Sequence, residues 1–135
     1  MDNIELTPRT PLPHEYLHLR AAAGLSPFSR AAAELALPNT LFAVLLEDQG
    51  RAIGMGRLIG DGGCFFQVVD IAVDPAYQGR GLGKRIMAAL MAHVATLPKG
   101  AYVSLIADTP ADQLYAQFGF VPTAPRSLGM AFRVT

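Results

Sequence analysis

Three consecutive apolar runs in the middle of the chain constrain its fold most strongly. Turn sequences of only two or three residues separate TLFAVLLED at 40–48, RAIGMGRLIG at 51–60 and CFFQVVDIAV at 64–73. Connections this short can join only antiparallel neighbours in a sheet. The sequence therefore predicts a meander of three antiparallel strands at the centre of the fold.

Helix and strand patterns alternate on either side of this meander. The apolar spacing predicts helices over 14–23, 28–37, 81–97 and 108–118, and further strands over 3–6, 101–107 and 127–134. Asp108 or Thr109 is expected as the N-cap of the helix over 108–118. We therefore predict a single α/β domain over residues 1–135, in which helices flank a mixed, mostly antiparallel central sheet.

The composition predicts a folded protein without a nucleic-acid or membrane partner. With 135 residues, 51% of them hydrophobic, the chain can bury one core. Eleven basic and eleven acidic residues leave no net charge, whereas nonspecific nucleic-acid binding needs a positive surface. No apolar run reaches the roughly 20 residues that span a bilayer. The segment from Met1 to Pro13 also lacks the apolar centre of a signal peptide.

Cysteine and histidine usage predicts neither a disulfide nor a metal site. Cys64 is the only cysteine, which suits a reducing compartment such as the cytoplasm. His14 and His18 are four residues apart on a predicted helix, but two ligands without a third make a weak metal site. We therefore expect a cytoplasmic protein with no metal cofactor.

The glycine-rich stretch QGRGLGK at 78–84 predicts an anion-binding site at the start of a helix. It contains three glycines and two cations, namely Gly79, Gly81, Gly83, Arg80 and Lys84. The first four N–H groups of a helix lack partners and carry positive partial charge, so they attract anions. Glycines let a phosphate approach these amides closely. The stretch therefore predicts a cradle for a phosphate or pyrophosphate.

Two common phosphate-binding motifs do not match this stretch. A nucleotide P-loop needs Ser or Thr directly after its Gly-Lys pair, but Arg85 follows Lys84. A dinucleotide fingerprint needs a third glycine where Ile86 stands. The predicted cradle therefore belongs to another class of phosphate ligand.

Two motifs together resemble the GNAT superfamily of N-acetyltransferases. AVDPAYQGRGLG at 72–83 resembles its motif A, whose signature is Gln or Arg, two residues, Gly, one residue, and then Gly or Ala. LYAQFGF at 114–120 resembles its motif B, in which a tyrosine lies four residues before a Gly-Phe pair. The order of predicted elements also matches along nearly the whole chain. The resemblance implies the GNAT fold, with acetyl-coenzyme A (acetyl-CoA) as the cosubstrate.

The resemblance also implies which residues contact acetyl-CoA. Its pyrophosphate would lie on the motif A loop, formed by Gln78, Gly79, Arg80, Gly81, Leu82, Gly83 and Lys84. Its pantetheine arm would run along the main chain of Ile71, Ala72 and Val73. That path requires a strand splayed from its neighbour, which a bulge near Val73 to Pro75 could supply. Asp108 stands where the family often has a cofactor-contacting asparagine, so it either caps a helix or accepts a hydrogen bond.

Tyr115 and Asp70 are the candidate catalytic residues. By its place in motif B, Tyr115 would protonate the CoA thiolate as it leaves the tetrahedral intermediate. Asp70 is a carboxylate inside an apolar strand, expected on the face opposite Val69 and Ile71. It could bind the amine, assist its deprotonation or pair structurally with an arginine. Gln67 stands where some members have a catalytic Glu or His, and it cannot act as a base.

The resemblance implies an enzyme that moves an acetyl group from acetyl-CoA to a primary amine by direct attack in a ternary complex. The neutral, apolar composition favours a small-molecule acceptor, in a pocket formed by residues 23–30, the hairpin strands and the segment after Phe120. The alternatives are a noncatalytic acyl-CoA sensing module, or an acyltransferase that uses another acyl-CoA or a protein or peptide amine. Family members are often homodimers, and residues 127–134 could pair across a two-fold axis.

Overall fold

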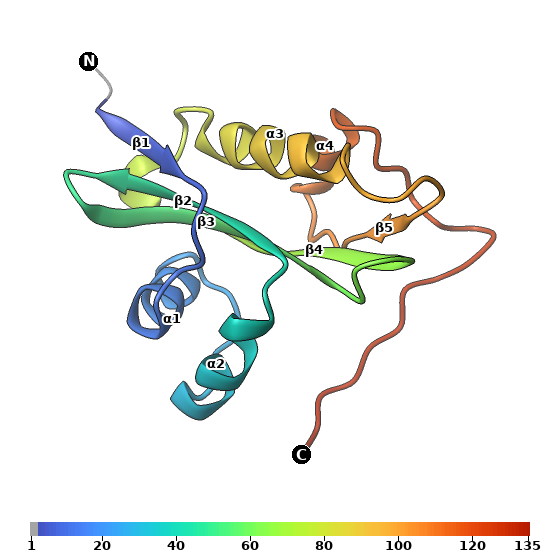
Figure 1. Cartoon of the computed structure of the whole chain (residues 1–135), viewed down its shortest axis with the longest axis horizontal. Coiled ribbons are helices and arrows are strands. Elements are labelled where there is room, and N and C mark those ends of the chain that lie inside the picture. The colour runs from blue at the N-terminus through green and yellow to red at the C-terminus, as the bar shows by residue number, and fades with distance from the viewer. Residues whose placement is uncertain (1–2) are drawn as a thin grey trace.

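The computed structural model describes residues 3–135 and shows a five-stranded sheet between two layers of helices (Figure 1). The strands, in their order across the sheet, are β1 (Ile4–Thr7), β2 (Phe42–Asp48), β3 (Arg51–Gly60), β4 (Phe65–Val73) and β5 (Tyr102–Ser104). Helices α1 (Pro13–Ala22) and α2 (Arg30–Ala36) cover one face, and α3 (Leu82–Val94) and α4 (Asp112–Ala116) cover the other. Two 3₁₀ turns connect these elements, η1 (Leu37–Asn39) and η2 (Pro75–Tyr77). The predicted α/β architecture is confirmed.

The predicted meander forms the centre of the sheet. Strands β1 to β4 pair antiparallel with their neighbours, and β5 lies parallel to β4. The turn between β2 and β3 places Gln49 at φ 51° and Gly50 at φ 81°. Two consecutive positive φ values are what a two-residue hairpin turn requires. The expected short connection at Gln49 and Gly50 is therefore confirmed.

A β-bulge interrupts β4 opposite Gly56. Met55 pairs with Ala72 and Arg57 pairs with Val69, so Gly56 alone opposes two residues, Asp70 and Ile71. The bulge was expected near Val73 to Pro75, and that position is wrong. Glycine at 56 favours the observed position, because a Cβ there would lie 2.8 Å from Ile71 Cδ1 and 2.5 Å from Ile86 Cγ2.

The sheet separates two apolar cores, and the bulge determines which side chains of β4 enter each. Val68 packs with Ile86 and Leu90 of α3. Ala72 packs with Tyr16 and Leu19 of α1 on the other face. Residues four apart in a regular strand share one face. The bulge adds one residue between Val68 and Ala72, so their side chains lie on opposite faces of the sheet.

Strand β4 pairs with β5 only over its first three residues. The paired residues run from Phe65 with Tyr102 to Gln67 with Ser104. Beyond Gln67, the described part of the chain supplies no partner for β4 on this side. The strand predicted over 101–107 is therefore shorter than expected, because the two strands separate. The separation of β4 from β5 is the splayed strand geometry that the resemblance to the GNAT superfamily requires.

The last two predicted elements differ from the structure. Helix α4 begins at Asp112 with Ala111 as its N-cap, so Asp108 and Thr109 do not cap it. The carbonyl of Asp108 instead accepts a hydrogen bond from the Ala111 amide in the preceding turn. The strand expected over 127–134 does not form, because the segment runs past the β5 edge without pairing with the sheet (Figure 1). Its apolar side chains are exposed.

Candidate functional site

Two cavities lie along β4. The first, called the Asp70 pocket here, has a volume of about 770 Å³ and is lined by Gln67, Val68, Val69 and Asp70 of this strand. The second, called the glycine-turn cleft, has a volume of about 450 Å³ and takes Ile71, Ala72 and Val73. Leu25 lines both cavities. The bulge in β4 therefore lies where the two cavities adjoin.

The glycine-turn cleft has the backbone geometry of an anion cradle. Gly79 and Gly81 adopt φ values of 82° and 73°, and no atom lies within 4 Å of a Cβ placed on either residue. Gly81 is the N-cap of α3, and the first N–H groups of this helix have no acceptor within it. The Gln78 side chain anchors the turn by donating to the Val73 carbonyl at 3.2 Å. The glycine-rich turn therefore places the first backbone amides of α3 next to an open space.

The structure brings most of the predicted acetyl-CoA residues together in this cleft. Its lining includes Ile71, Ala72, Val73, Gln78, Gly79, Gly81, Leu82, Gly83, Lys84 and Tyr115. Arg80 and Asp108 do not line it. The Arg80 guanidinium lies 5.1 Å from the centre of the Tyr77 ring, and Asp108 lines the Asp70 pocket instead.

Tyr115 projects from α4 into the glycine-turn cleft. Its side chain is half-buried, and its hydroxyl makes no hydrogen bond to residues 3–135. Burial raises the pKa of Tyr115, and the negative charge of Asp108 adds to the rise. The phenol therefore stays protonated at neutral pH and can donate to a ligand in the cleft.

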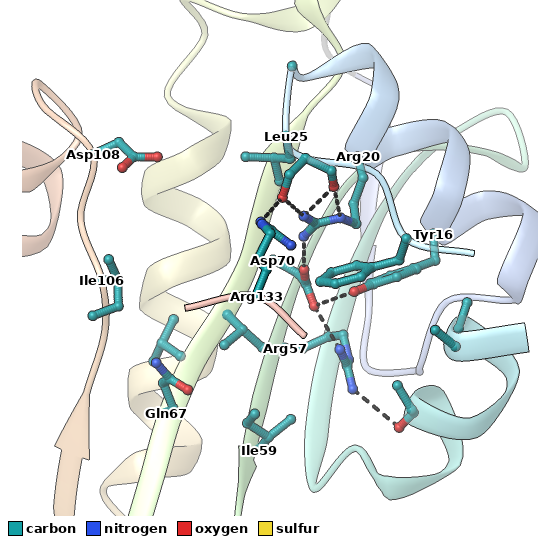
Figure 2. A pocket seen from close by; sticks show the side chains of 18 residues that line it. Tyr16, Arg20, Leu25, Arg57, Ile59, Gln67, Asp70, Ile106, Asp108 and Arg133 are labelled. Carbon is teal, nitrogen blue, oxygen red and sulfur yellow. Dashed lines mark hydrogen bonds and ion pairs between the residues drawn. The ribbon is translucent and has the colours of Figure 1, made fainter. Parts of the chain in front are cut away.

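Asp70 is the centre of a buried polar cluster (Figure 2). Its carboxylate forms ion pairs with Arg20 and with Arg57, the latter at 2.7 Å. It also accepts a hydrogen bond of 3.0 Å from the Tyr16 hydroxyl. Only 5% of the Asp70 side chain is exposed. Of the three roles left open for Asp70, pairing with arginine is the one that the structure displays.

The backbone at Asp70 is in the left-handed region, with φ at 60°. Aspartate tolerates this conformation better than most residues, although it still carries strain. The bulge turns both Val69 and Asp70 toward the same pocket. The expectation that they lie on opposite faces is therefore wrong.

Sequence reasoning anticipated an arginine partner for Asp70 but did not identify Arg20 or Arg57 as that partner. Arg57 lies in the middle of an apolar strand, as Asp70 does, and two opposite charges in neighbouring apolar strands signal a pair. Tyr16 and Arg20 are four residues apart, so they share one face of α1. The Arg20 guanidinium also lies 4.5 Å from the centre of the Phe28 ring.

The three segments expected to form an acceptor pocket line the Asp70 pocket together. Ser26 and Phe28 come from residues 23–30, Arg57 and Ile59 from β3, and Arg133 from the segment after Phe120. Gln67 lines the same pocket. The expectation that these distant segments surround one cavity is confirmed.

His93 and the acidic side chains of residues 3–135 form no metal site. His93 stacks on Phe42 with ring centroids 4.2 Å apart. Within residues 3–135, no group of three or more His, Cys, Asp or Glu side chains is placed to hold a metal ion. The same residues include no helix with the length and apolarity needed to cross a bilayer.

Known proteins resemble this chain along much of its length. Residues 38–122 match the model of the acetyltransferase (GNAT) domain family. The crystal structure of a protein of unknown function from meticillin-resistant Staphylococcus aureus, described as a "Probable Acetyltransferase", has a TM-score of 0.92. It is 51% identical, and the match covers 97% of this chain and 99% of that chain.

Two curated plant proteins match over shorter stretches. Histone acetyltransferase TAP1 of Glycine max is 36% identical over 73 residues, which are 54% of this chain and 31% of TAP1. The chloroplastic serotonin N-acetyltransferase 2 of Oryza sativa subsp. japonica is 35% identical over 95 residues, 66% of this chain and 46% of that protein. The chain thus spans less than half the length of either relative. Because the family model matches more than half of this chain, the protein belongs to the GNAT family of acetyltransferases.

Proposed function

We propose that this protein transfers the acetyl group of acetyl-CoA to the primary amine of a small molecule by direct attack in a ternary complex. The observation that carries this proposal is the meeting of two cavities along β4. GNAT acetyltransferases use acetyl-CoA in general, so we assign the glycine-turn cleft to acetyl-CoA and the Asp70 pocket to the amine. Ligands seated in both would meet beside the bulge at Asp70 and Ile71.

The residues of the glycine-turn cleft fit acetyl-CoA. The open space at Gly79 and Gly81 lets phosphate oxygens reach the first amides of α3, and Lys84 adds a positive charge at the same place. Residues Ile71 to Val73 lie beyond the part of β4 that pairs with β5, so their backbone is open on that side. A pantetheine arm could therefore hydrogen-bond to this stretch of backbone as an added strand does.

Tyr115 is the proposed acid of the reaction. The amine nitrogen bonds to the thioester carbonyl carbon, and the carbon–sulfur bond breaks with its electron pair on sulfur. The nitrogen, which is positively charged after the attack, releases one proton to water, and this leaves a neutral amide. The Tyr115 hydroxyl gives its proton to the departing sulfur, and solvent later restores that proton. Burial keeps the pKa of Tyr115 high, so the proton is present at neutral pH.

In this proposal, Asp70 holds the side chains of Arg20, Arg57 and Tyr16 in place and does not take part in the chemistry. Its carboxylate is already held by two guanidinium groups and the Tyr16 hydroxyl. Both of its oxygens are therefore already occupied by donors from this chain, so Asp70 does not accept the amine proton in this proposal. The amine therefore enters in its neutral form or loses its proton to water.

The charges in the Asp70 pocket favour a small acceptor over a basic protein tail. Three arginines and two aspartates line this pocket, which leaves one excess positive charge. A lysine-rich peptide of the kind found in histones would be repelled by this excess charge. The names of the plant relatives include both a histone and a small-amine acetyltransferase, and this observation supports the latter class.

The remaining alternatives are a noncatalytic acyl-CoA sensing module and an enzyme that takes a different acyl-CoA. The free Tyr115 hydroxyl in the cleft favours catalysis over sensing. We also propose a cytoplasmic location, which the exposed free thiol of Cys64 supports. The rice relative is named chloroplastic, so fractionation of cells expressing the protein tests this point.

The function is tested by following CoA thiol release with a panel of primary amines. We expect acetylation of at least one small amine, with a product identified by mass spectrometry. Tight acetyl-CoA binding without turnover of any small amine or peptide would support the sensing module. Competition among acyl-CoAs of increasing chain length identifies the preferred donor.

A further inference from the structure

The Asp70 cluster contains more positive than negative charge. Arg20 and Arg57 share a single carboxylate, that of Asp70. The side chains of these arginines are 10% and 6% exposed, so water screens their charge poorly. The other charged groups lining the pocket are Arg133 and Asp108, which cancel each other formally. The pocket therefore retains one formal positive charge.

The guanidinium groups also retain hydrogen-bonding capacity, because each has five N–H groups. Arg20 donates to Asp70 and to the carbonyl and hydroxyl oxygens of Ser26, using up to four of them. Arg57 donates to Asp70, to Thr40 Oγ1 at 2.9 Å and to the Ala36 carbonyl, using three. Within residues 3–135, at least one N–H of Arg20 and two of Arg57 have no acceptor.

A buried charge is costly unless it is paired and hydrogen-bonded. The fold already orders both arginines, through Tyr16, Ser26, Thr40 and Asp70. Ordered guanidinium groups that line a cavity form strong paired hydrogen bonds to carboxylates and phosphates. The excess charge therefore points to an anionic group on the molecule that enters this pocket.

The other residues that line the pocket indicate the chemistry of the remaining part of that molecule. The pocket is also lined by six apolar residues, Leu25, Phe28, Ala36, Ile59, Val69 and Ile106. Figure 2 shows Ile106 and Asp108 across the pocket from Arg20 and Arg57. A ligand that spans this pocket would place an acid on the arginines and an apolar group against these side chains.

We propose that the acceptor is an amine that also carries an acidic group, a carboxylate or a phosphate, held by Arg20 and Arg57. This inference rests on the proposed function, because it names the substrate class of the same site.

Matched amines test this proposal on the unaltered protein. Phenylalanine, phenylalaninamide and phenethylamine share one apolar body and differ at the carboxylate. O-phosphoethanolamine and ethanolamine form a second set for phosphate. We expect kcat/KM, calculated for the neutral amine, to be about tenfold or more higher for the acid-bearing member of one set, as one charged hydrogen bond predicts. A preference within the phenylalanine set identifies the anion as a carboxylate, and a preference within the phosphoethanolamine set identifies it as a phosphate.

Substitutions of Arg57 test whether the preference arises from this cluster. Arg57→Gln removes the excess charge and leaves Asp70 paired with Arg20, so we expect the preference for acid-bearing amines to fall to about onefold. Arg57→Lys keeps the charge and should retain part of the preference. Arg30→Gln, on the exposed surface of α2 and outside the pocket, is the matched control and should keep the full preference.

The outcomes separate this inference from the proposed function. Acetylation of neutral amines at rates equal to or above those of their acid-bearing partners would overturn the inference and leave the acetyltransferase standing. If no amine is acetylated, the proposed function itself fails. Acid-bearing amines preferred equally by the parent protein and a folded Arg57→Gln variant would place the anion elsewhere and overturn the assignment to this cluster.

Discussion

Val69 and Asp70 are consecutive residues of β4, yet both line the Asp70 pocket. The bulge opposite Gly56 makes this possible, since neighbouring residues of a regular strand point to opposite faces. It places the Asp70 carboxylate between Arg20 and Arg57, while Ile71 packs on the α3 side of the sheet. The one extra residue that the bulge adds to β4 thus places the Asp70 ion pairs in the lining of the Asp70 pocket.

The first prediction concerns the role of Asp70. Asp70→Asn leaves two buried arginines without their shared carboxylate, so we expect the free energy of unfolding to fall by about 3–5 kcal/mol. Thermal denaturation should show a decrease of roughly 10 °C or more. Asp112→Asn, at an exposed position in α4, is the control and should melt near the parent protein. An Asp70→Asn protein with normal stability and a raised KM for the amine would instead assign Asp70 to amine binding.

The second prediction concerns the anion cradle. Gly81→Val places a branched side chain in the open space next to the first amides of α3, so acetyl-CoA should bind at least about tenfold more weakly, as the loss of one charged hydrogen bond predicts. Isothermal titration calorimetry measures the change. Gly100→Val is matched, because Gly100 has φ at 87° and equally open surroundings but lies outside the cleft. Equal acetyl-CoA affinity in both variants would remove the pyrophosphate from this turn.

The third prediction concerns the proposed acid. Tyr115→Phe removes the hydroxyl and keeps the ring, so kcat should fall by about 10- to 100-fold with near-normal acetyl-CoA binding. The range is at the low end for acid catalysis because a thiolate is a good leaving group. Tyr102→Phe changes an exposed tyrosine of β5 outside the cleft and should leave kcat unchanged. A fully active Tyr115→Phe enzyme excludes Tyr115 from the chemistry.

The fourth prediction concerns stability at alkaline pH. Burial raises the pKa of Tyr16, with a further contribution from Asp70, and burial also raises the pKa of Tyr115. In the unfolded chain both phenols ionise near about pH 10, whereas the folded protein keeps them protonated. The unfolded state then binds fewer protons, so stability decreases above that pH, by up to about 1.4 kcal/mol per pH unit for each tyrosine.

Urea denaturation at about pH 8 and about pH 11 measures this decrease, and Tyr16→Phe supplies the comparison. The variant lacks one of the two phenols, so its stability should depend less steeply on pH than that of the parent protein. An identical dependence in both proteins would show that Tyr16 does not contribute to it.

The fifth prediction concerns assembly. Leu128, Met130, Phe132 and Val134 alternate along the C-terminal segment and are between 73% and 92% exposed. Such a period-two apolar pattern is typical of a strand that packs one face against a partner. We propose that two copies associate through residues 127–134. Light scattering coupled to size-exclusion chromatography should give a dimer for the parent protein and a monomer for Phe132→Asp.

Leu35→Asp changes an exposed apolar residue of α2 that belongs to no such pattern, and it is the control for this experiment. We expect it to remain a dimer. A monomeric parent protein at about 50 μM, well above the Kd of a stable dimer, would exclude the proposed association.

The sequence predicted the antiparallel meander and the start of α3 at the glycine-rich turn, because the signals for both are local. Runs of apolar residues and two-residue turns specify the antiparallel meander over short distances, and these elements occur as expected. The glycines of the turn at Gly79 and Gly81 require positive φ, which the sequence indicates by residue type alone. The place of Tyr115 in the cleft likewise agrees with its motif.

The sequence predicted the end of the chain less well. The alternation from Leu128 to Val134 indicates a strand, but a strand needs a neighbouring edge with which to hydrogen-bond. In the structure, β4 and β5 separate after Gln67 and the C-terminal segment runs past them without pairing. The alternating apolar pattern is present in this segment, but the paired strand that it predicted does not form.

The antiparallel meander and the conformation of the glycine-rich turn could be predicted from the sequence alone, because each depends on residues close together in the chain. The Asp70 cluster could not, because it depends on a bulge whose position is set by Gly56 on one side and by the packing of Ile71 against Ile86 on the other. Those contacts join residues far apart in sequence. Tertiary structure alone therefore decided that Asp70 faces two arginines, and so decided the charge of the proposed acceptor pocket.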